Sequence, residues 1–189
     1  NTPMTRFAHT LIALMLSALP AQAFVIGGAI QQQRGNGVFE KLDATSGFAV
    51  GADTFDTDNL YAFDEDQNIV LDRDIRVDIS APRPGAWIRK GETIASHYVF
   101  FDSLAGIQIG YVDFDSPVLG VAAYQATMAA TDFLANTDVN YLSPELRGLE
   151  QGDYVWIDEN DPFRLWVYWA GSSPGDYIRV FTKRSPGIS

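Results

Sequence analysis

The sequence predicts an all-β protein, an antiparallel β-sandwich of the jelly-roll-like type with one or two short helices. Short runs rich in Val, Ile, Phe, Tyr and Trp recur along the chain, separated by Gly, Pro, Asp and Asn. Ile75, Val77 and Ile79 alternate with Arg76 and Asp78, as expected of a strand with one face in water. Helical periodicity is scarce by comparison.

Ten segments have the composition of strands and are bounded by turn-forming residues. In chain order they cover residues 24–30, 47–50, 60–63, 68–79, 95–101, 107–114, 118–124, 154–157, 163–169 and 176–182. Turn signals separate them, among them Pro-Arg-Pro-Gly at 82–85 and Ser-Ser-Pro-Gly at 172–175.

Two short helices are expected between the strands. Residues 126–134 are rich in Ala and Met, although the β-branched Thr127 and Thr131 weaken the helical signal. Ser143 before Pro144 predicts an N-cap followed by proline at the first helical position, and Gly148 limits this helix to about two turns.

Residues 1–23 have the pattern of a secretory signal peptide. Arg6 gives a positive start, residues 11–19 are a compact apolar run, Pro20 ends it, and Ala-Gln-Ala at 21–23 predicts cleavage before Phe24. The apolar run is shorter than the roughly 20 residues that a permanent membrane helix needs. We therefore expect one β-sandwich domain over 24–189, secreted or periplasmic in a bacterium and outside the membrane after cleavage.

The composition limits the classes of partner that this protein is expected to bind. The chain has 13 Lys and Arg against 24 Asp and Glu and a net charge of −11; without Arg6 there are 12 basic and 24 acidic residues, or −12. Such a surface repels nucleic acid and anionic lipid, so neither is an expected partner. The absence of cysteine means that the exported domain is stabilised by packing, bound ions or assembly instead of disulfides.

Acidic residues cluster in the first third of the chain. Their side-chain oxygens suit Ca²⁺, which takes six to eight oxygen ligands. The segment 64–68 imitates the start of an EF-hand loop, but Ile69 and Ile75 stand where the turn glycine and the bidentate Glu belong. The hypothesis is a Ca²⁺ site assembled from loops, and the alternative is a solvated acidic rim. The candidate ligands are Asp53, Asp56, Asp58, Asp64, Asp66 and Asn68.

The segment 163–169 predicts an aromatic surface. Its alternation places Arg164, Trp166 and Tyr168 on one face, and a hairpin with 176–182 would bring further aromatic and basic side chains beside them. Flat rings next to hydrogen-bonding groups are typical of sugar-binding and interface surfaces. The alternative is that both faces are buried. The candidate ligand-binding residues are Trp166, Tyr168, Arg164, Tyr177 and Arg179.

Patterns for nucleophilic catalysis are weak. His97 is the only histidine of the mature region and lies in a predicted strand, where we expect a structural hydrogen bond. Gly171 to Gly175 matches G-x-S-x-G, but a strand follows instead of the helix that a nucleophile elbow requires. No pair of carboxylates stands out as the acid and base of a glycosidase.

Three stretches together resemble a known group: 59–68 (NLYAFDEDQN), 96–102 (SHYVFFD) and 146–150 (LRGLE). The chain resembles uncharacterised exported bacterial proteins, some of which resemble exosortase-sorted envelope or matrix proteins. The resemblance covers most of the mature region from Asn59 onward and implies no catalytic residues, because the group has no assigned activity. The Pro-Glu-Pro sorting motif is not found, so we expect release into the periplasm or medium.

The hypothesis that these observations favour is an exported, non-enzymatic binding or matrix protein that engages carbohydrate and is stabilised by Ca²⁺. Two alternatives stay open at this point. One is a carboxylate-dependent polysaccharide hydrolase or lyase, which requires a cleft with two facing carboxylates. The other is an extracellular structural subunit that self-assembles through strand edges or the aromatic surface.

Overall fold

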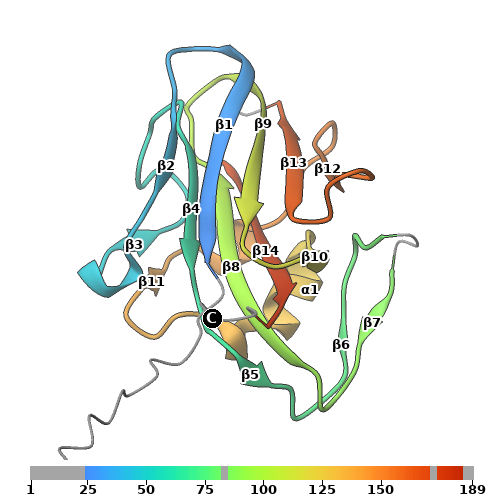
Figure 1. Cartoon of the computed structure of the whole chain (residues 1–189). Helices are drawn as coiled ribbons and strands as arrows, with labels where there is room; N and C mark the ends of the chain where they lie inside the picture. Colours follow the sequence, from blue (N-terminus) through green and yellow to red (C-terminus); the bar gives the residue numbers. More distant parts are fainter. Residues whose placement is uncertain (1–23, 82–84, 171–173, 185–189) are drawn as a thin grey trace, which may run out of the picture.

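Two β-sheets pack face to face in the computed structural model, which describes residues 24–81, 85–170 and 174–184 (Figure 1). The first, sheet A, has four antiparallel strands. Their order across the sheet is β1 (Val25–Arg34), β9 (Ile107–Phe114), β13 (Arg164–Trp169) and β12 (Tyr154–Ile157).

The second, sheet B, has six strands. Five follow one another as β10 (Val118–Ala122), β14 (Asp176–Lys183), β8 (Thr93–Phe101), β4 (Leu60–Asp64) and β2 (Phe39–Lys41). The sixth, β5 (Ile69–Val70), pairs with β8 beyond the end of β4. All pairs are antiparallel except β2 with β4.

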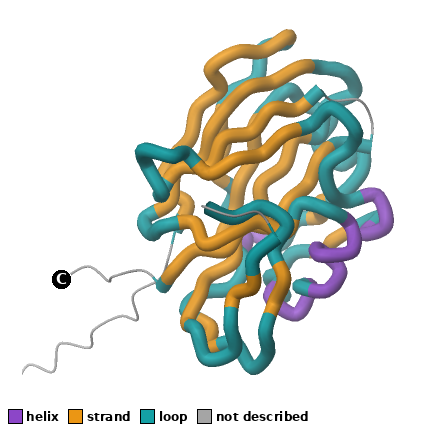
Figure 2. The backbone as a smooth tube through the Cα atoms, turned by 90° about the vertical axis from the view of Figure 1, so that its right-hand side faces the viewer, coloured by secondary structure: helices purple, strands orange, loops and turns teal. Residues whose placement is uncertain are grey.

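Two small ribbons and four helical turns complete the fold. The parallel pair is β3 (Ala49–Val50) with β11 (Asn140–Tyr141), and the antiparallel pair is β6 (Ile75–Arg76) with β7 (Trp87–Ile88). The helical segments are α1 (Gln125–Ala130) and the 3₁₀ turns η1 (Ala44–Ser46), η2 (Asp132–Leu134) and η3 (Pro144–Leu146). Figure 2 shows helical segments gathered at one side of the strands.

The burial patterns of the strands explain the layers. In β9 and β13 buried residues alternate with partly exposed ones, so sheet A has one face in the core and one toward solvent. In β8 and β14 almost every residue is buried, because sheet B is covered on both faces. One core lies between the sheets, and a second lies on the other face of sheet B, where Met128 of α1 and Leu134 of η2 pack against it.

The all-β, sandwich-like fold is confirmed, with local differences. The predicted strand 68–79 is divided into β5 and β6, and the predicted helix 126–134 is divided at Thr131 into α1 and η2. Ser143 occupies the predicted N-cap position before Pro144 at the start of η3, but it has φ 47° and its side chain makes no capping hydrogen bond. Three short strands, β2, β7 and β11, were not predicted because their sequences carry no alternation long enough to detect.

The predicted hairpin of 163–169 with 176–182 is wrong. β13 pairs with β9 and β12 in sheet A, whereas β14 pairs with β8 and β10 in sheet B. The connection therefore crosses from one sheet to the other. The sequence of β14 mixes charged with apolar residues, so it does not reveal that seven of its eight residues are buried in the middle of sheet B.

Some sequence expectations fall on residues that the structure does not describe. The signal peptide (1–23), most of the turn at 82–85, and Gly171 to Ser173 of the G-x-S-x-G match lie outside the described residues. Within the described residues, no helix is long and apolar enough to span a membrane.

Candidate ligand-binding face

The outer face of sheet A carries aromatic side chains across three strands. Tyr111 on β9 pairs in register with Trp166 on β13, which pairs in turn with Trp156 on β12. The Tyr111 and Trp166 rings meet edge to face with centroids 5.1 Å apart, and Trp166 stacks on Trp156 at 5.9 Å and 6°. Tyr154 and Tyr168 form a second cross-strand pair at 5.9 Å. These five residues are called the aromatic face below.

Exposure is greatest at the edge of the sheet. Tyr154 and Trp156 on β12 are 64% and 41% exposed, while Trp166 and Tyr168 are half-buried. Because β12 is the last strand of sheet A, the side of the Trp156 ring away from Trp166 faces no further strand. Sequence reasoning missed Tyr154 and Trp156, although their alternation with buried Val and Ile in 154–157 carried the signal.

Trp166 is held in place by a carboxylate. Its indole Nε1 donates to Oδ2 of Asp158 over 2.8 Å, and Oδ1 of Asp158 accepts from the backbone N–H groups of Asn160 and Asp161. The hydrogen bond from Trp166, together with these backbone bonds, lowers the pKa of Asp158. The loop 158–161 thus orders one ring of the aromatic face and keeps a negative charge beside it.

Arg164 is fixed beside the same face. Its Nε and Nη2 donate to the two carboxylate oxygens of Asp113 over 2.7 and 2.9 Å, and its guanidinium lies 3.8 Å from the Tyr111 ring centroid. The hydrogen bond to Asp113 raises the pKa of Arg164 above its already high ordinary value. Arg164 therefore stays charged in a fixed orientation, which reduces the entropy cost of ligand binding.

Tyr177 and Arg179 do not belong to this face. Both lie on β14 in sheet B, where they are 1% and 0% exposed. The sequence prediction placed them beside Trp166 through the hairpin that does not form. Their side chains point into the second core, on the face of sheet B that lies away from sheet A.

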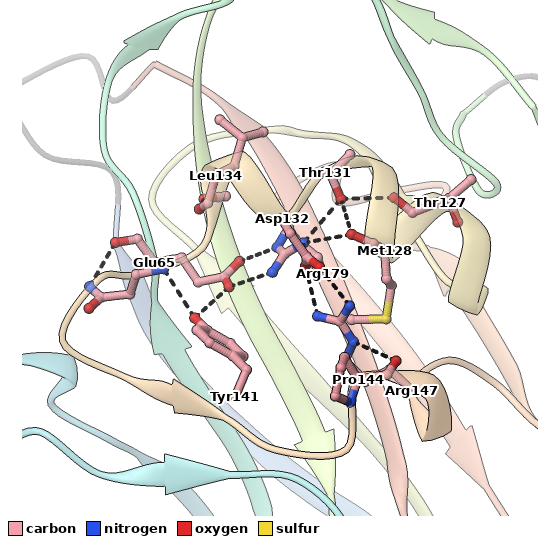
Figure 3. Close-up of polar contacts among 12 residues, drawn as sticks. Glu65, Thr127, Met128, Thr131, Asp132, Leu134, Tyr141, Pro144, Arg147 and Arg179 are labelled. Atoms are coloured by element: carbon pink, nitrogen blue, oxygen red, sulfur yellow. Dashed lines mark hydrogen bonds and ion pairs between the residues drawn. The ribbon is translucent and has the colours of Figure 1, made fainter.

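Arg179 instead forms a buried ion pair (Figure 3). Its Nε and Nη2 donate to the carboxylate of Glu65 over 2.6 and 2.9 Å, and both side chains are fully buried. Its Nη1 donates to the carbonyl of Met128, to Oγ1 of Thr131 and to Oδ1 of Asp132. Arg179 on β14 thus links Glu65, the residue after β4, to the helical segments that cover this face of sheet B.

Two neighbours extend this network (Figure 3). Arg147 donates through Nη1 and Nη2 to both oxygens of Asp132 over 2.7 and 2.8 Å. The Tyr141 hydroxyl donates to Glu65 over 2.7 Å, and burial together with the charge of Glu65 raises the pKa of Tyr141. The network joins β4, β11, β14, η2 and η3, and its role is structural.

The six predicted metal ligands do not converge on one point. Two of them, Asp53 and Asp56, meet Asp102 at the end of β8, with one carboxylate oxygen of each within 4.8 Å of the others. This acidic triad could hold a metal ion. Asp102 also accepts from the backbone N–H groups of Asp53, Thr54 and Phe55 over 2.8–3.2 Å, which fixes the loop. Asp53 and Asp56 adopt positive φ, a conformation that Asp tolerates better than most residues.

The other four candidate ligands lie outside this triad, and the three aspartates among them have partners of their own. Asp58 accepts from the Ser103 hydroxyl over 2.9 Å, and Asp66 accepts from the N–H of the next residue. Asn68 occupies a turn with φ 53°. Asp64 contacts Lys41 and His97 at 2.7 and 2.8 Å. Spacing along the chain did not reveal the contacts of Asp58 and Asp64, because Ser103 and His97 are distant in sequence.

His97 is a buried strand residue, as expected. Its Nδ1 lies 2.8 Å from Oδ1 of Asp64 and its Nε2 lies 3.0 Å from Oγ1 of Thr182. This is the connectivity of a hydroxyl–imidazole–carboxylate triad, but His97 and Thr182 are both 0% exposed. The arrangement joins β4, β8 and β14, and both ends of the imidazole are enclosed in the protein.

A cavity of about 510 Å³ lies at the end of the sandwich near β2 and β4, and Lys41, Asp43, Asp64 and Glu65 are among its lining residues. Burial alone would raise the pKa of Asp64, but the bonds and charges from His97 and Lys41 lower it. Both carboxylate oxygens of Glu65 accept hydrogen bonds from Arg179. Neither carboxyl is therefore poised as the general acid of a glycosidase.

A second carboxyl pair is buried where sheet A and sheet B connect. Asp176 and Asp153 are 2% and 9% exposed, and Asp153 accepts from the N–H groups of Glu150 and Ala170 over 2.9 Å. Burial, the hydrogen bond with Asp153 and the charges of Asp153 and Glu150 raise the pKa of Asp176 to about 9. Asp176 is therefore protonated at neutral pH and shares its proton with Asp153.

Comparisons with protein-family models, with curated proteins and with solved structures find no match to this chain.

Proposed function

We propose that the protein is an exported, non-enzymatic binding protein that engages polysaccharide through the aromatic face of sheet A. The observation that carries this proposal is the exposed pair Tyr154 and Trp156 next to the ordered ring of Trp166. Exposed aromatic patches of this kind mark interaction sites on soluble proteins. The C–H face of a pyranose ring matches the open side of Trp156.

Polar groups at the rim of the aromatic face support a sugar as the ligand. Asp158 can accept hydrogen bonds from hydroxyl groups, and Nη1 of Arg164, which has no hydrogen-bond partner within the described part of the chain, can donate one. Both groups are already oriented by Trp166 and Asp113. Apolar rings surrounded by fixed donors and acceptors suit a ligand with alternating C–H and O–H surfaces.

The charge favours a neutral polysaccharide. The chain carries a net charge of −11, and Asp113, Asp158 and Asp161 lie around the aromatic face. A polyanion such as an alginate would be repelled over about 8–10 Å at physiological ionic strength. A neutral glucan, xylan or mannan avoids this repulsion.

Ca²⁺ is the cation that suits the acidic triad. Asp53, Asp56 and Asp102 supply only hard carboxylate oxygens, and waters would complete six to eight ligands. Binding there would stabilise the loop 51–56 and, through Asp102, the end of β8. The role proposed for Ca²⁺ is stability of the exported domain, because the triad belongs to the loops at one end of sheet B and includes no member of the aromatic face.

Affinity electrophoresis tests the proposal. The mature protein is run through gels that contain soluble β-glucan, xylan, mannan or alginate. We expect retardation by at least one neutral polymer and none by alginate. Absence of retardation in every neutral polymer would contradict carbohydrate binding. Concentration-dependent association without any polysaccharide would instead favour self-assembly through the open edge of β12.

A further inference from the structure

The backbone of Phe24 forms a reciprocal pair of hydrogen bonds with Asp115, the residue after β9. The N–H of Phe24 donates to Oδ1 of Asp115 over 2.9 Å, and the N–H of Asp115 donates to the carbonyl of Phe24 over 3.0 Å. The partners are 91 residues apart in the chain. This contact holds the residue that directly precedes β1 against the end of β9.

Polar partners also surround the next residue. The N–H of Val25 donates to Oδ1 of Asp64 over 2.8 Å, and Nζ of Lys41 donates to the carbonyl of Val25 over 2.7 Å. The same Nζ lies 5.0 Å from the centroid of the Phe24 ring. Among the described residues, the charged groups in these contacts are Asp115, Asp64 and Lys41, and Asp43 and Glu65 line the cavity that Phe24 also borders.

We infer that Phe24 becomes the N-terminus of the mature protein and that its α-ammonium group forms an ion pair with Asp115 that anchors β1. The inference rests on the cleavage predicted from Ala-Gln-Ala at 21–23, and is independent of the carbohydrate proposal. A signal peptidase adds water across the 23–24 peptide bond. The hydroxyl joins the carbonyl carbon of Ala23, and the other proton of the water goes to the nitrogen of Phe24. The new carboxyl group releases its proton and the amine takes up one, so the products are a carboxylate and an ammonium.

The position of the charge makes this anchor specific. The nitrogen that becomes charged already lies at hydrogen-bond distance from the carboxylate, so processing turns an amide contact into a charge-assisted one. A single retained residue would move the ammonium one Cα–Cα step, about 3.8 Å, along the chain. β1 is an edge strand of sheet A that pairs only with β9, so it depends on such an anchor against fraying.

The predicted cleavage before Phe24 is tested by exporting the full chain in a bacterial host. Intact mass spectrometry then gives the mass of the released protein. The mass expected is that of residues 24–189. A mature chain that starts at any other residue overturns the inference. Phe24 is 37% exposed, so we expect the ion pair to be partly open to solvent.

The ion pair between the Phe24 ammonium and Asp115 is tested with four proteins. They are the mature protein and a form that retains Ala23, each with and without the substitution Asp115→Asn. At pH 6.5 the mature protein should melt about 1–3 °C above the extended form, as expected for a partly exposed ion pair. The difference should disappear in Asp115→Asn and above pH 10, where the α-amino group is neutral. An equal difference in the Asp115→Asn background, or none in the wild type, overturns the inference.

Discussion

Arg179 and Glu65 form an ion pair in which neither charge reaches water. The two side chains are fully buried, and the second core packs around them. Removing charges from water is costly, and the cost is offset here by two bonds between the pair and by further bonds to Tyr141, Met128 and Thr131. Loss of one partner leaves the other as an unpaired buried charge.

Arg179→Met is therefore expected to lower the free energy of unfolding by about 3–5 kcal/mol. Arg89→Met is the matched control, because Arg89 pairs with Asp74 at the surface with 65% of its side chain exposed. The control should change the free energy of unfolding by less than about 1 kcal/mol. Urea denaturation measures both, and equal effects of the two substitutions would contradict a structural role for Arg179.

Asp176 gives the stability a distinctive pH dependence. Its pKa is raised to about 9 in the folded protein by burial and by Asp153, from an ordinary value of 3.8. The folded state therefore binds this proton more tightly than the unfolded state. The stabilisation is complete below pH 3.8 and is lost progressively as the pH rises toward 9.

Asp176→Asn should remove this dependence, because the amide is neutral at every pH and can still donate to Asp153. Relative to wild type, the variant should gain stability steadily from pH 4.5 to 8, by on the order of 5 kcal/mol over that range. Urea unfolding at several pH values measures the difference. A difference that stays constant with pH, or that favours wild type more strongly at pH 8, would show that Asp176 is ionised in the fold.

At the scale of elements, the loop 51–56 depends on a single carboxylate. Asp102 accepts three successive backbone N–H groups from this loop and brings Asp53 and Asp56 near it. Three carboxylates at this separation repel one another, which destabilises the loop unless a cation neutralises them. The loop is therefore the element where Ca²⁺ should act.

Millimolar Ca²⁺ should raise the melting temperature of the mature protein above its value in EDTA. A ligand at 100 times its dissociation constant adds about 2.7 kcal/mol, which corresponds to roughly 5–10 °C for a chain of this size. Asp56→Asn should abolish most of the shift. Asp66→Asn, at a predicted ligand that the structure places outside the triad, should preserve it. A shift that survives Asp56→Asn would contradict the triad as the binding site.

Strands could be predicted where apolar and polar residues alternate within one short segment of the chain. Residues 107–114 and 154–157 were predicted with the bounds of β9 and β12, and the two faces of β13 follow from its alternation. The pairing of β13 and β14 was not predictable, because strand order is set by packing between distant segments. The interior role of Arg179 was missed for the same reason: its partner Glu65 lies 114 residues away.

At the scale of the whole molecule, the layers leave one sheet face open. Sheet B is covered by sheet A on one face and by α1, the 3₁₀ turns and the small ribbons on the other. The outer face of sheet A is therefore open, and Tyr111, Tyr154, Trp156, Trp166 and Tyr168 lie side by side on it. We expect polysaccharide to bind on this face.

Titration calorimetry of a retarding neutral oligosaccharide against three proteins tests that claim most directly. The proteins are wild type, Trp156→Ala and Trp87→Ala; Trp87 is also exposed, at 51%, but lies on β7 away from sheet A. Trp156→Ala should weaken binding at least tenfold, or about 1.4 kcal/mol, whereas Trp87→Ala should bind like wild type. Undiminished binding by Trp156→Ala, or an equal loss in both variants, would contradict the aromatic face as the carbohydrate site.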